Sequence, residues 1–308
     1  MPPNVELASL QLPYPTITAR AHVVVVGAGV FGASAAYLLA RAGSRITLID
    51  HDDVCRHASG RNPGNLNPLL ASRRELVPLA LESLRLHVAI AAELAATVAP
   101  YAIEPVRRVL LAFGDEDHAE LDDAERIFAE HVGFSTARLD ARALQAIDPR
   151  LSSAIEEGLL IEGNRSLDSC AFNRALIAGA RKADAKVIRA DVNGLDARGH
   201  VVSAVRSDAG SFACDAVVLA TGPWVDETKH WLDLDLGVEP VKGEMLRMRL
   251  PPPNITHDLT HGMISLYRRG NDEAWVGVTR ERAGFDESPT AEGRRALIEG
   301  ASRIMPAI

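Results

Sequence analysis

Three closely spaced glycines, Gly27, Gly29 and Gly32, form the pattern in this chain that most directly indicates a chemistry. The first permits a tight turn, the second lets a backbone approach a pyrophosphate, and the third lets a helix pack closely on a strand. Unpaired N–H groups at the start of that helix direct partial positive charge at the phosphates. Asp50 follows about 20 residues later, where a carboxylate can accept hydrogen bonds from a ribose 2′-OH. The pattern predicts a dinucleotide site.

The elements that must position these residues lie on both sides of the glycines. The β-branched run 23–26 predicts a buried strand, and the alanine-rich stretch 33–42 predicts a helix. A second apolar run, 46–49, ends directly on Asp50. Strand, glycine turn, helix, strand and acid therefore occur in the order that a dinucleotide-binding unit requires.

A second group of small residues follows another predicted buried strand, residues 215–220. This strand leads into Thr221 and Gly222, where the backbone could again come close to a cofactor. Nicotinamide enzymes have no recurring need for such a second site. The pair of glycine sites therefore favours FAD over NAD.

Composition narrows the class of protein. At about 150 residues per domain, a chain of 308 residues suggests two domains. An apolar content of 47% with only 5% aromatic residues is typical of an α/β core. The net charge of −8 speaks against a broad nucleic-acid-binding surface. No apolar run is long enough to span a membrane, and the N-terminal residues lack the pattern of a secretory signal, so we expect a cytoplasmic protein.

The remaining pattern predicts two styles of strand. The early strands are buried and parallel, whereas residues 185–221 predict short strands with turns at 193–194, 198–199 and 209–210. Further hairpin-like strands are predicted within 240–250 and 264–280. Helices are predicted at 75–98, 115–131, 140–147, 170–183 and 290–304. We therefore predict an α/β fold in which a Rossmann-like FAD-binding domain is interleaved with a mostly antiparallel α+β substrate domain.

Four segments give the sequence a family resemblance. They are VVVVGAGVFGASAAYLLARAG with Asp50, HASGRNPGNLNPLL, DAVVLATGPW with PVKGEMLRM, and VGVTRERAGFDESPTAEGRRALIEGASRIMPAI. In this order they resemble the FAD-dependent amine and amino-acid oxidoreductases of the D-amino-acid oxidase type, nearest to the glycine oxidases of thiamine biosynthesis. The resemblance implies oxidation of a small primary or secondary amine, such as glycine or an N-substituted glycine, to an imine by hydride transfer to the flavin.

The resemblance also implies a division of the chain and a cofactor site. After a flexible extension over residues 1–20, the FAD-binding domain is expected at 21–72 and 165–228, and the substrate domain at 73–164 and 229–308. The implied cofactor-binding residues are Gly27, Ala28, Gly29, Phe31, Gly32, Asp50, His57, Ala58, Ser59, Gly60, Arg61, Asn62, Thr221, Gly222 and Trp224.

On the substrate side, the resemblance implies Glu244, Met245, Ser265 and Tyr267. Glu244 stands where the family usually has glutamine, and the family's carboxylate-contacting tyrosine falls at Ser265. Tyr267 lies two residues further on, on the same face of a strand. We interpret the neighbouring Arg268 and Arg269 as strand-end surface charges rather than carboxylate anchors. No catalytic side chain is assigned, since the flavin carries the chemistry.

The family continues beyond the segment that ends here at Ile308, with a strand that carries a substrate-binding arginine and with a strand and helix that close the FAD site. We therefore expect this chain to be a C-terminally incomplete member. That expectation leaves open a catalytically silent remnant that binds a dinucleotide. A third alternative is the FAD oxidase domain of the enzyme that modifies the tRNA wobble uridine, which segment 57–70 also resembles.

Cysteines and histidines are the remaining candidates for chemistry. Cys55, Cys170 and Cys214 form neither a CxxC motif nor an even disulfide set, which indicates a reducing compartment. We predict no metal at Cys55 and His57 with Asp52 and Asp53, and none at the HxxxH pair His257 and His261. Related sarcosine and dimethylglycine dehydrogenases carry a flavin-linked histidine in a place similar to His57, so the sequence leaves open whether the flavin is bound covalently. It also leaves open oxygen or a quinone as the electron acceptor, and a homo-oligomer.

Overall fold

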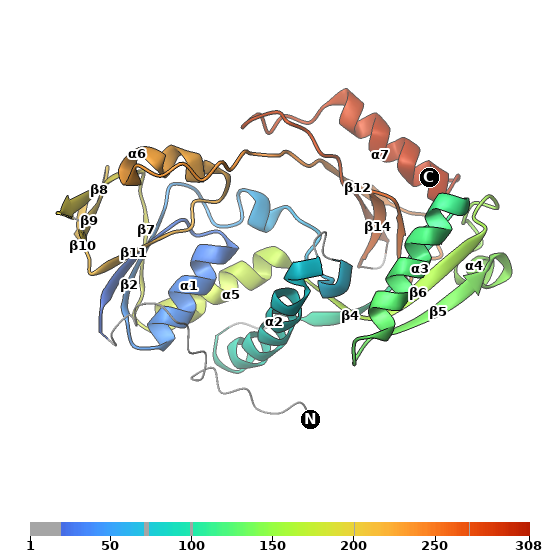
Figure 1. Ribbon diagram of the computed structural model, residues 1–308, viewed down its shortest axis with the longest axis horizontal. Coiled ribbons are helices and arrows are strands. Elements are labelled where there is room, and N and C mark those ends of the chain that lie inside the picture. Colours follow the sequence, from blue (N-terminus) through green and yellow to red (C-terminus); the bar gives the residue numbers. More distant parts are fainter. Residues whose placement is uncertain (1–19, 71–73, 99–100, 200, 271) are drawn as a thin grey trace. The chain divides into compact units, whose positions relative to one another are not determined.

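A computed structural model describes residues 20–70, 74–98, 101–199, 201–270 and 272–308. Residues 1–19 of the predicted N-terminal extension lie outside these ranges. The chain divides into two compact units, each assembled from separated stretches (Figure 1). Unit 1 consists of Met1–Asn62, Arg85–Ala102 and Leu167–Glu239, and unit 2 of Pro63–Leu84, Ile103–Ser166 and Pro240–Ile308.

A parallel sheet forms the centre of unit 1. Its order is β11-β1-β2-β7, made of β1 (His22–Val26), β2 (Arg45–Asp50), β7 (Lys186–Arg189) and β11 (Ala216–Leu219). The four valines of β1 are almost wholly buried because both faces of the sheet are covered. Helices α1 (Val30–Arg41) and α5 (Ser169–Lys182) pack side by side in this unit (Figure 1).

A small antiparallel sheet completes unit 1. It comprises β8 (Val192–Arg198), β9 (Val201–Ser207) and β10 (Gly210–Ala213), and Val205 of β9 packs with Val24 and Val26 of β1. The 3-10 turn η5 (Gly222–Thr228) and the short helix α6 (Lys229–Leu232) follow β11. The long helix α2 (Val77–Thr97) begins in unit 2 and has its later part in unit 1.

A large mixed sheet organises unit 2. Its strand order is β12-β15-β14-β13-β4-β6-β3, and β5 also pairs with β6. The bounds are β3 (Asn65–Leu66), β4 (Ile103–Ala112), β5 (Ser135–Asp140), β6 (Glu157–Leu167), β12 (Met245–Arg249), β13 (Asp258–His261), β14 (Ile264–Arg269) and β15 (Glu273–Gly277). Most neighbours are antiparallel, but β13 runs parallel to β4.

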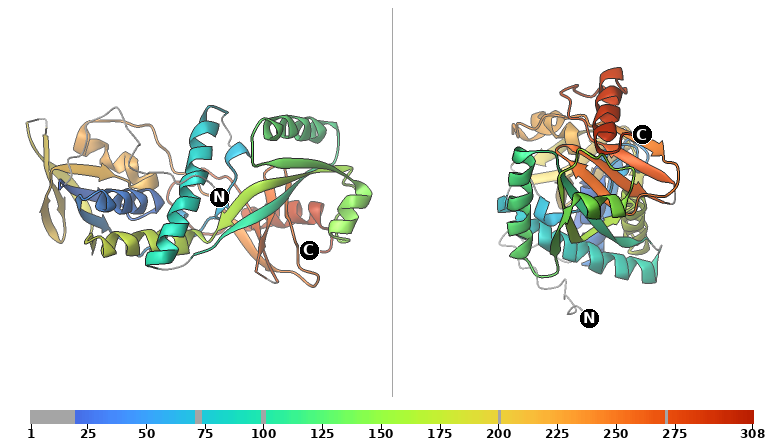
Figure 2. Two further views of the ribbon diagram at one scale, coloured as in Figure 1. Left: turned by 90° about the horizontal axis from the view of Figure 1, so that it is seen from below. Right: turned by 90° about the vertical axis from the view of Figure 1, so that its right-hand side faces the viewer.

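Strand β4 contributes to two separate apolar clusters, because successive side chains of a strand point to opposite faces. Val109 and Leu111 join a cluster with helix α7 (Ala291–Ile304), whereas Leu110 and Ala112 join one with helix α3 (Asp115–Ala129). The sheet of unit 2 is therefore a middle layer with a helix on each side (Figure 2, α3 green and α7 red). Helix α4 (Ala141–Ile147) adds Leu144 to the α7 cluster.

This architecture confirms the predicted α/β class with a parallel and a mostly antiparallel part. The turn predicted at 193–194 is wrong: these residues lie inside β8, where a bulge shifts the pairing with β9 between Val192 and Gly194. Strands β5, β6 and β13 were not predicted. The unit boundaries also differ from the expected ones, since Arg85–Ala102 groups with unit 1 and Pro63–Leu84, which begins within the expected FAD-binding domain, groups with unit 2.

Among the helices in the described ranges, none is both long enough and apolar enough to span a bilayer.

Candidate functional site

The glycine turn between β1 and α1 is closed against two neighbouring backbones. Gly27 has φ +99°, and a Cβ there would lie 2.3 Å from the carbonyl oxygen of Ala220. A Cβ on Gly32 would lie 1.8 Å from the carbonyl oxygen of Gly27. Any side chain at these two positions would push β1, the end of β11 and α1 apart. The start of α1 is thereby held at the carboxyl ends of the strands.

The N-terminus of α1 has no acidic side chain in its first turn, and Gly29 at the N-cap offers no capping oxygen. Its positive dipole end is therefore not neutralised by its own residues. Phe31, in the same turn, is 81% exposed.

Asp50 lies at the end of β2, beside the glycine turn. Its Oδ2 accepts a hydrogen bond from the Ala28 N–H at 2.5 Å, and its Oδ1 accepts one from the Asp52 N–H at 2.9 Å. The carboxylate, 24% exposed, is thus fixed on the turn by two backbone donors.

The loop after β2 folds back onto the same turn. The 3-10 turn η2 (Ala58–Gly60) places Ser59 so that its Oγ accepts from the Val30 N–H at 2.9 Å. Asn62 Nδ2 donates to the Ala58 carbonyl at 2.8 Å and stabilises this bend. Ser59 therefore serves as a cap for α1 that comes from a distant part of the chain.

Two histidines and an aspartate gather in this loop. His57 Nε2 lies 2.7 Å from Asp52 Oδ2, and His51 Nε2 lies 3.3 Å from the same oxygen. The hydrogen bond from His57 holds the pKa of Asp52 below its ordinary value. One ligand atom from each residue lies within 4.8 Å of the others, a grouping that could hold a metal ion. Cys55, which the sequence placed with them, is committed to a disulfide instead.

The segment after β11 closes the other side. Thr221 leads into Gly222, which has φ +57°, and then into η5. Thr221 Oγ1 is buried and has no hydrogen-bond partner among the described residues. Trp224 packs edge-on against His57, with ring centroids 4.7 Å apart.

These segments line one cleft of about 560 Å³ within unit 1. The cleft-lining residues that the sequence predicted are Gly27, Ala28, Gly29, Phe31, Asp50, His57, Ala58, Ser59, Asn62, Thr221, Gly222 and Trp224. Gly32 instead packs against the backbone of Gly27, and neither Gly60 nor Arg61 lines the cleft. The structure therefore brings most of the predicted cofactor residues to one hollow.

The predicted substrate residues lie in unit 2. Glu244 Oε1 accepts from the Thr290 N–H at 2.9 Å and lies 3.0 Å from Lys242 Nζ. Burial acts to raise the pKa of Glu244, but the bonds to Lys242 and Thr290 outweigh it and hold the pKa below its ordinary value. Ser265, 5% exposed, shares a hydrogen bond with Thr260. The side chains of Glu244 and Ser265 therefore both have hydrogen-bond partners within unit 2.

Met245 and Tyr267 are placed differently. Met245 is the first residue of β12 and pairs with Gly277 of β15. A Cβ on Gly277 would lie 3.0 Å from the Met245 side chain. The Arg108 guanidinium lies 5.6 Å from the centre of the Tyr267 ring. Arg268 pairs with the exposed Glu104, and Arg269 lies over Trp275, so both have contacts at the strand.

His257 and His261 do not share a helical face, since His257 directly precedes β13 and His261 is the last residue of that strand. His257 is bonded to its neighbour Thr256, and His261 contacts Asp117 at 3.2 Å. Burial lowers the pKa of His257. The two imidazoles thus have separate partners.

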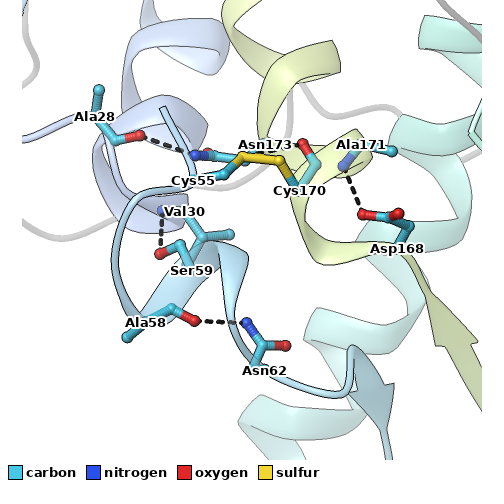
Figure 3. Close-up of a disulfide and its surroundings, with 10 residues drawn as sticks. All are labelled: Ala28, Val30, Cys55, Ala58, Ser59, Asn62, Asp168, Cys170, Ala171 and Asn173. Carbon is cyan, nitrogen blue, oxygen red and sulfur yellow. Dashed lines mark hydrogen bonds between the residues drawn. A yellow bond between two sulfur atoms is a disulfide. The ribbon is translucent and has the colours of Figure 1, made fainter. Parts of the chain in front are cut away.

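The cysteine count and spacing gave no indication of a disulfide, but the structure contains one. Cys55 and Cys170 form a disulfide with their Cα atoms 5.5 Å apart (Figure 3). Cys214 is free and half-buried, and burial raises the pKa of its thiol. The fold brings together two residues that are 115 positions apart in the chain, a proximity that local spacing cannot signal. The disulfide removes one reason for expecting a reducing compartment.

Sequence reasoning also missed Asn173, which is 0% exposed. Its Nδ2 donates to the Ala28 carbonyl at 2.9 Å (Figure 3), so α5 holds the same residue whose N–H is bonded to Asp50. A buried asparagine within the apolar face of a predicted helix is the signal that could have found it.

Comparison with known proteins agrees with this geometry. Residues 22–308 match the profile of the FAD dependent oxidoreductase (DAO) family. Glycine oxidase of Geobacillus kaustophilus is 29% identical over 303 residues, which cover 95% of this chain and 78% of that protein. The hydrogen cyanide synthase subunit HcnC of Pseudomonas aeruginosa is 26% identical over an alignment that covers 92% of this chain and 78% of that protein. The crystal structure of glycine oxidase from Geobacillus kaustophilus matches with a TM-score of 0.85 at 25% identity, over 94% of this chain and 79% of that one.

Proposed function

The chain belongs to the FAD-dependent oxidoreductases, and from that premise we propose that it oxidises a small primary or secondary amine or amino acid, of the glycine or N-substituted glycine type, to an imine. The similarity to glycine oxidases supports this substrate class. The cofactor is FAD, which when bound supplies the hydride acceptor. The protein must bind that cofactor, hold the substrate against it and exclude water.

One observation carries the assignment of the cofactor to the cleft of unit 1. The glycine turn, the carboxylate of Asp50 and the Thr221 hydroxyl, which has no hydrogen-bond partner within the described part of the chain, all meet at this cleft. A buried hydroxyl without a partner is costly unless a ligand completes it. The residues that line the cleft therefore fit a dinucleotide, whose phosphates and sugar they could bind.

We assign the roles of these residues accordingly. The start of α1, kept open by Gly29, is to hold the pyrophosphate. Asp50 is to accept hydrogen bonds from the adenosine ribose, and the loop 57–62 is to lie along the pyrophosphate and the flavin edge. Thr221 and Gly222 are to contact the cofactor from the opposite wall. The interleaved assignment of unit 1 to FAD and unit 2 to the substrate is part of the same proposal.

For the substrate, the bonding in unit 2 favours two of the four predicted residues. Glu244 and Ser265 have their polar atoms engaged with Thr290 and Thr260. Within the described ranges, Met245 and Tyr267 have no side-chain hydrogen bond of this kind, so we favour them as substrate contacts. A cytoplasmic location, oxygen or a quinone as acceptor, and a homo-oligomer remain predictions.

Reconstitution with FAD, followed by a panel of amines, tests the proposal. We expect a flavin spectrum after desalting and bleaching of that spectrum by glycine, sarcosine or a related amine under nitrogen. Peroxide release in air would identify oxygen as the acceptor, and its absence with a dye-linked signal would favour a quinone. Tight NAD binding without FAD uptake would overturn the cofactor assignment, and failure of every amine would overturn the substrate class.

The similarity to HcnC favours a second candidate, in which the chain is one subunit of a hydrogen cyanide synthase. Cyanide detection in the same amine panel separates the two candidates. Cyanide in place of peroxide would favour the second.

A further inference from the structure

The disulfide joins two elements that are far apart in sequence and that both reach the glycine turn. Cys55 lies in the loop after β2, and Cys170 is the second residue of α5. Each cysteine is only partly buried, so a small or protein-borne dithiol can approach the bond. The bond also lies at the wall of the cleft, because Cys55 is one of its lining residues.

A hydrogen bond to the glycine turn lies close to each cysteine. On the loop side, Ser59 accepts from the Val30 N–H at 2.9 Å. On the helix side, Asn173 donates to the Ala28 carbonyl at 2.9 Å. The disulfide therefore closes a ring that runs from the turn through Ser59, the two sulfurs and Asn173 back to the turn (Figure 3).

The backbone conformation at Cys55 links the position of its sulfur to the position of Ser59. Cys55 has φ +72°, a left-handed conformation that is unfavourable for a residue with a Cβ. Gly60 packs so tightly on it that a Cβ would lie 2.2 Å from the Cys55 carbonyl oxygen. Once the sulfurs separate, Cys55 can return to an ordinary conformation, and Gly60 and Ser59 must move with it.

The helix end of the link is held independently of the disulfide. Asp168 caps α5 by accepting from the Ala171 N–H at 2.8 Å (Figure 3), and seven residues of this helix are buried. We expect α5 and Asn173 to keep their places when the disulfide opens. The loop 51–62 is the part that is released.

From this geometry we propose that the Cys55–Cys170 disulfide is a redox switch for cofactor retention: the oxidised chain holds FAD tightly and the dithiol form holds it weakly. The proposal rests on the assignment of FAD to the cleft of unit 1. Linkage requires the reciprocal effect, so bound FAD makes the disulfide harder to reduce.

The switching step is a thiol–disulfide exchange with a dithiol reductant. A thiolate of the reductant attacks one sulfur, the Cys55–Cys170 bond breaks, and a mixed disulfide forms. The second thiol of the reductant then displaces the chain. Cys55 and Cys170 end as two thiols that have gained two electrons and two protons, and the reductant ends as a disulfide.

FAD titrations of the two redox forms test the switch. The full chain is stripped of FAD, and one half is reduced with dithiothreitol under nitrogen and desalted. Mass spectrometry after alkylation of a sample verifies the thiol count, and flavin fluorescence then gives the dissociation constant. We expect the reduced form to bind FAD at least tenfold more weakly than the oxidised form.

Two cysteine variants sharpen the result. Cys170→Ser should bind FAD as weakly as the reduced wild type and should no longer respond to dithiothreitol. Cys214→Ser, which removes the free thiol and leaves the disulfide, should match the wild type and stay sensitive to the reductant. Far-UV circular dichroism identifies a variant that fails to fold. In that case the comparison of the oxidised and reduced wild type decides the proposal by itself.

A second readout uses the reverse direction of linkage. The midpoint potential of the disulfide, measured in a glutathione or dithiothreitol series, should become more negative when FAD is present. Equal dissociation constants in the two redox forms, or equal potentials with and without FAD, would overturn the proposal. Failure of every amine in the panel would leave these titrations intact and would count only against the proposed reaction.

Discussion

Unit 1 and unit 2 use different chemistry to hold distant strands and loops together. In unit 1, the loop after β2 is tied to α5 by the Cys55–Cys170 disulfide and to α1 through Ser59. In unit 2, Arg108 of β4 pairs with Asp258 of β13 at 3.1 Å, and their side chains are 6% and 5% exposed. Asp258 also accepts from the Arg268 N–H, which brings in β14.

The disulfide of unit 1 and the buried ion pair of unit 2 are broken by different conditions. A disulfide between half-buried sulfurs can be opened by a thiol reductant. The buried ion pair is insensitive to reductant, but each charge depends on its partner to remain inside the protein. The link in unit 1 is therefore sensitive to a reductant, whereas the link in unit 2 is sensitive to the loss of either charge.

Asp258→Ala should produce the largest effect, because it leaves the Arg108 guanidinium buried without its partner. Removing one member of a buried pair costs roughly 3–5 kcal/mol of unfolding free energy. Urea denaturation of the oxidised protein measures this change. Glu104→Ala is the matched control, since its pair with Arg268 is largely exposed and should be worth less than about 1 kcal/mol. Equal losses for the two variants would contradict the role of the buried pair.

Asp50→Ala should weaken FAD binding by about 10- to 100-fold, because a hydrogen bond to a charged group contributes roughly 1.5–3 kcal/mol. Flavin fluorescence titration measures the dissociation constant. Asp53→Ala is the control: Asp53 also lines the cleft, but its side chain is 82% exposed and pairs with Arg189. An unchanged constant for Asp50→Ala would move the ribose contact to another residue.

Ser59→Ala and Thr290→Ala compare two helix caps, one in each unit. Ser59 caps α1 from the loop after β2, and Thr290 caps α7 by accepting from the Gly293 N–H at 2.9 Å. Each loss should cost about 1 kcal/mol of unfolding free energy. Only Ser59→Ala should also weaken FAD binding in titration. If Thr290→Ala weakened it equally, the effect would be one of general stability.

The smallest expected effect is the loss of unfolding free energy at acid pH that comes from Glu244. The pKa of Glu244 is held below its ordinary value despite burial, because Lys242 and Thr290 favour the carboxylate. Its contribution to stability is therefore complete above the ordinary pKa of 4.5 and is lost as pH falls through the lowered value. Glu244→Gln should flatten this part of the profile of unfolding free energy against pH. A wild-type profile that is flat below pH 4.5 would exclude Glu244 as a contributor.

The parts of the molecule that sequence predicts well are those fixed by neighbours in the chain. Gly27, Gly29 and Asp50 could be placed because a strand, a turn and a helix follow one another without a gap. The same local rule failed at Asn193–Gly194, since this residue pair suits a bulge as well as a hairpin turn. Strand β6 was missed because its polar residues, such as Asn164 and Arg165, interrupt the alternation that marks a strand.

The parts that sequence could not predict depend on contacts made by the whole fold. Cys55 meets Cys170 only because α5 packs beside α1 and directs its N-terminus at the loop. Arg108 meets Asp258 because two strands whose paired residues are 150 positions apart in the chain become parallel neighbours. An arginine inside the apolar run of β4 was a visible signal, but its partner could not be named from spacing.

The two-sided packing of β4 has a consequence for how this chain can vary. Val109 and Leu111 serve one apolar cluster, and Leu110 and Ala112 serve the other, so this second half of the strand, unlike its exposed start, has no solvent-facing side on which change is harmless. One residue inserted or deleted here would exchange the two sets and offer each cluster side chains of the wrong volume. Homologous proteins should therefore keep the length of this strand fixed and place their insertions and deletions in the loops around it.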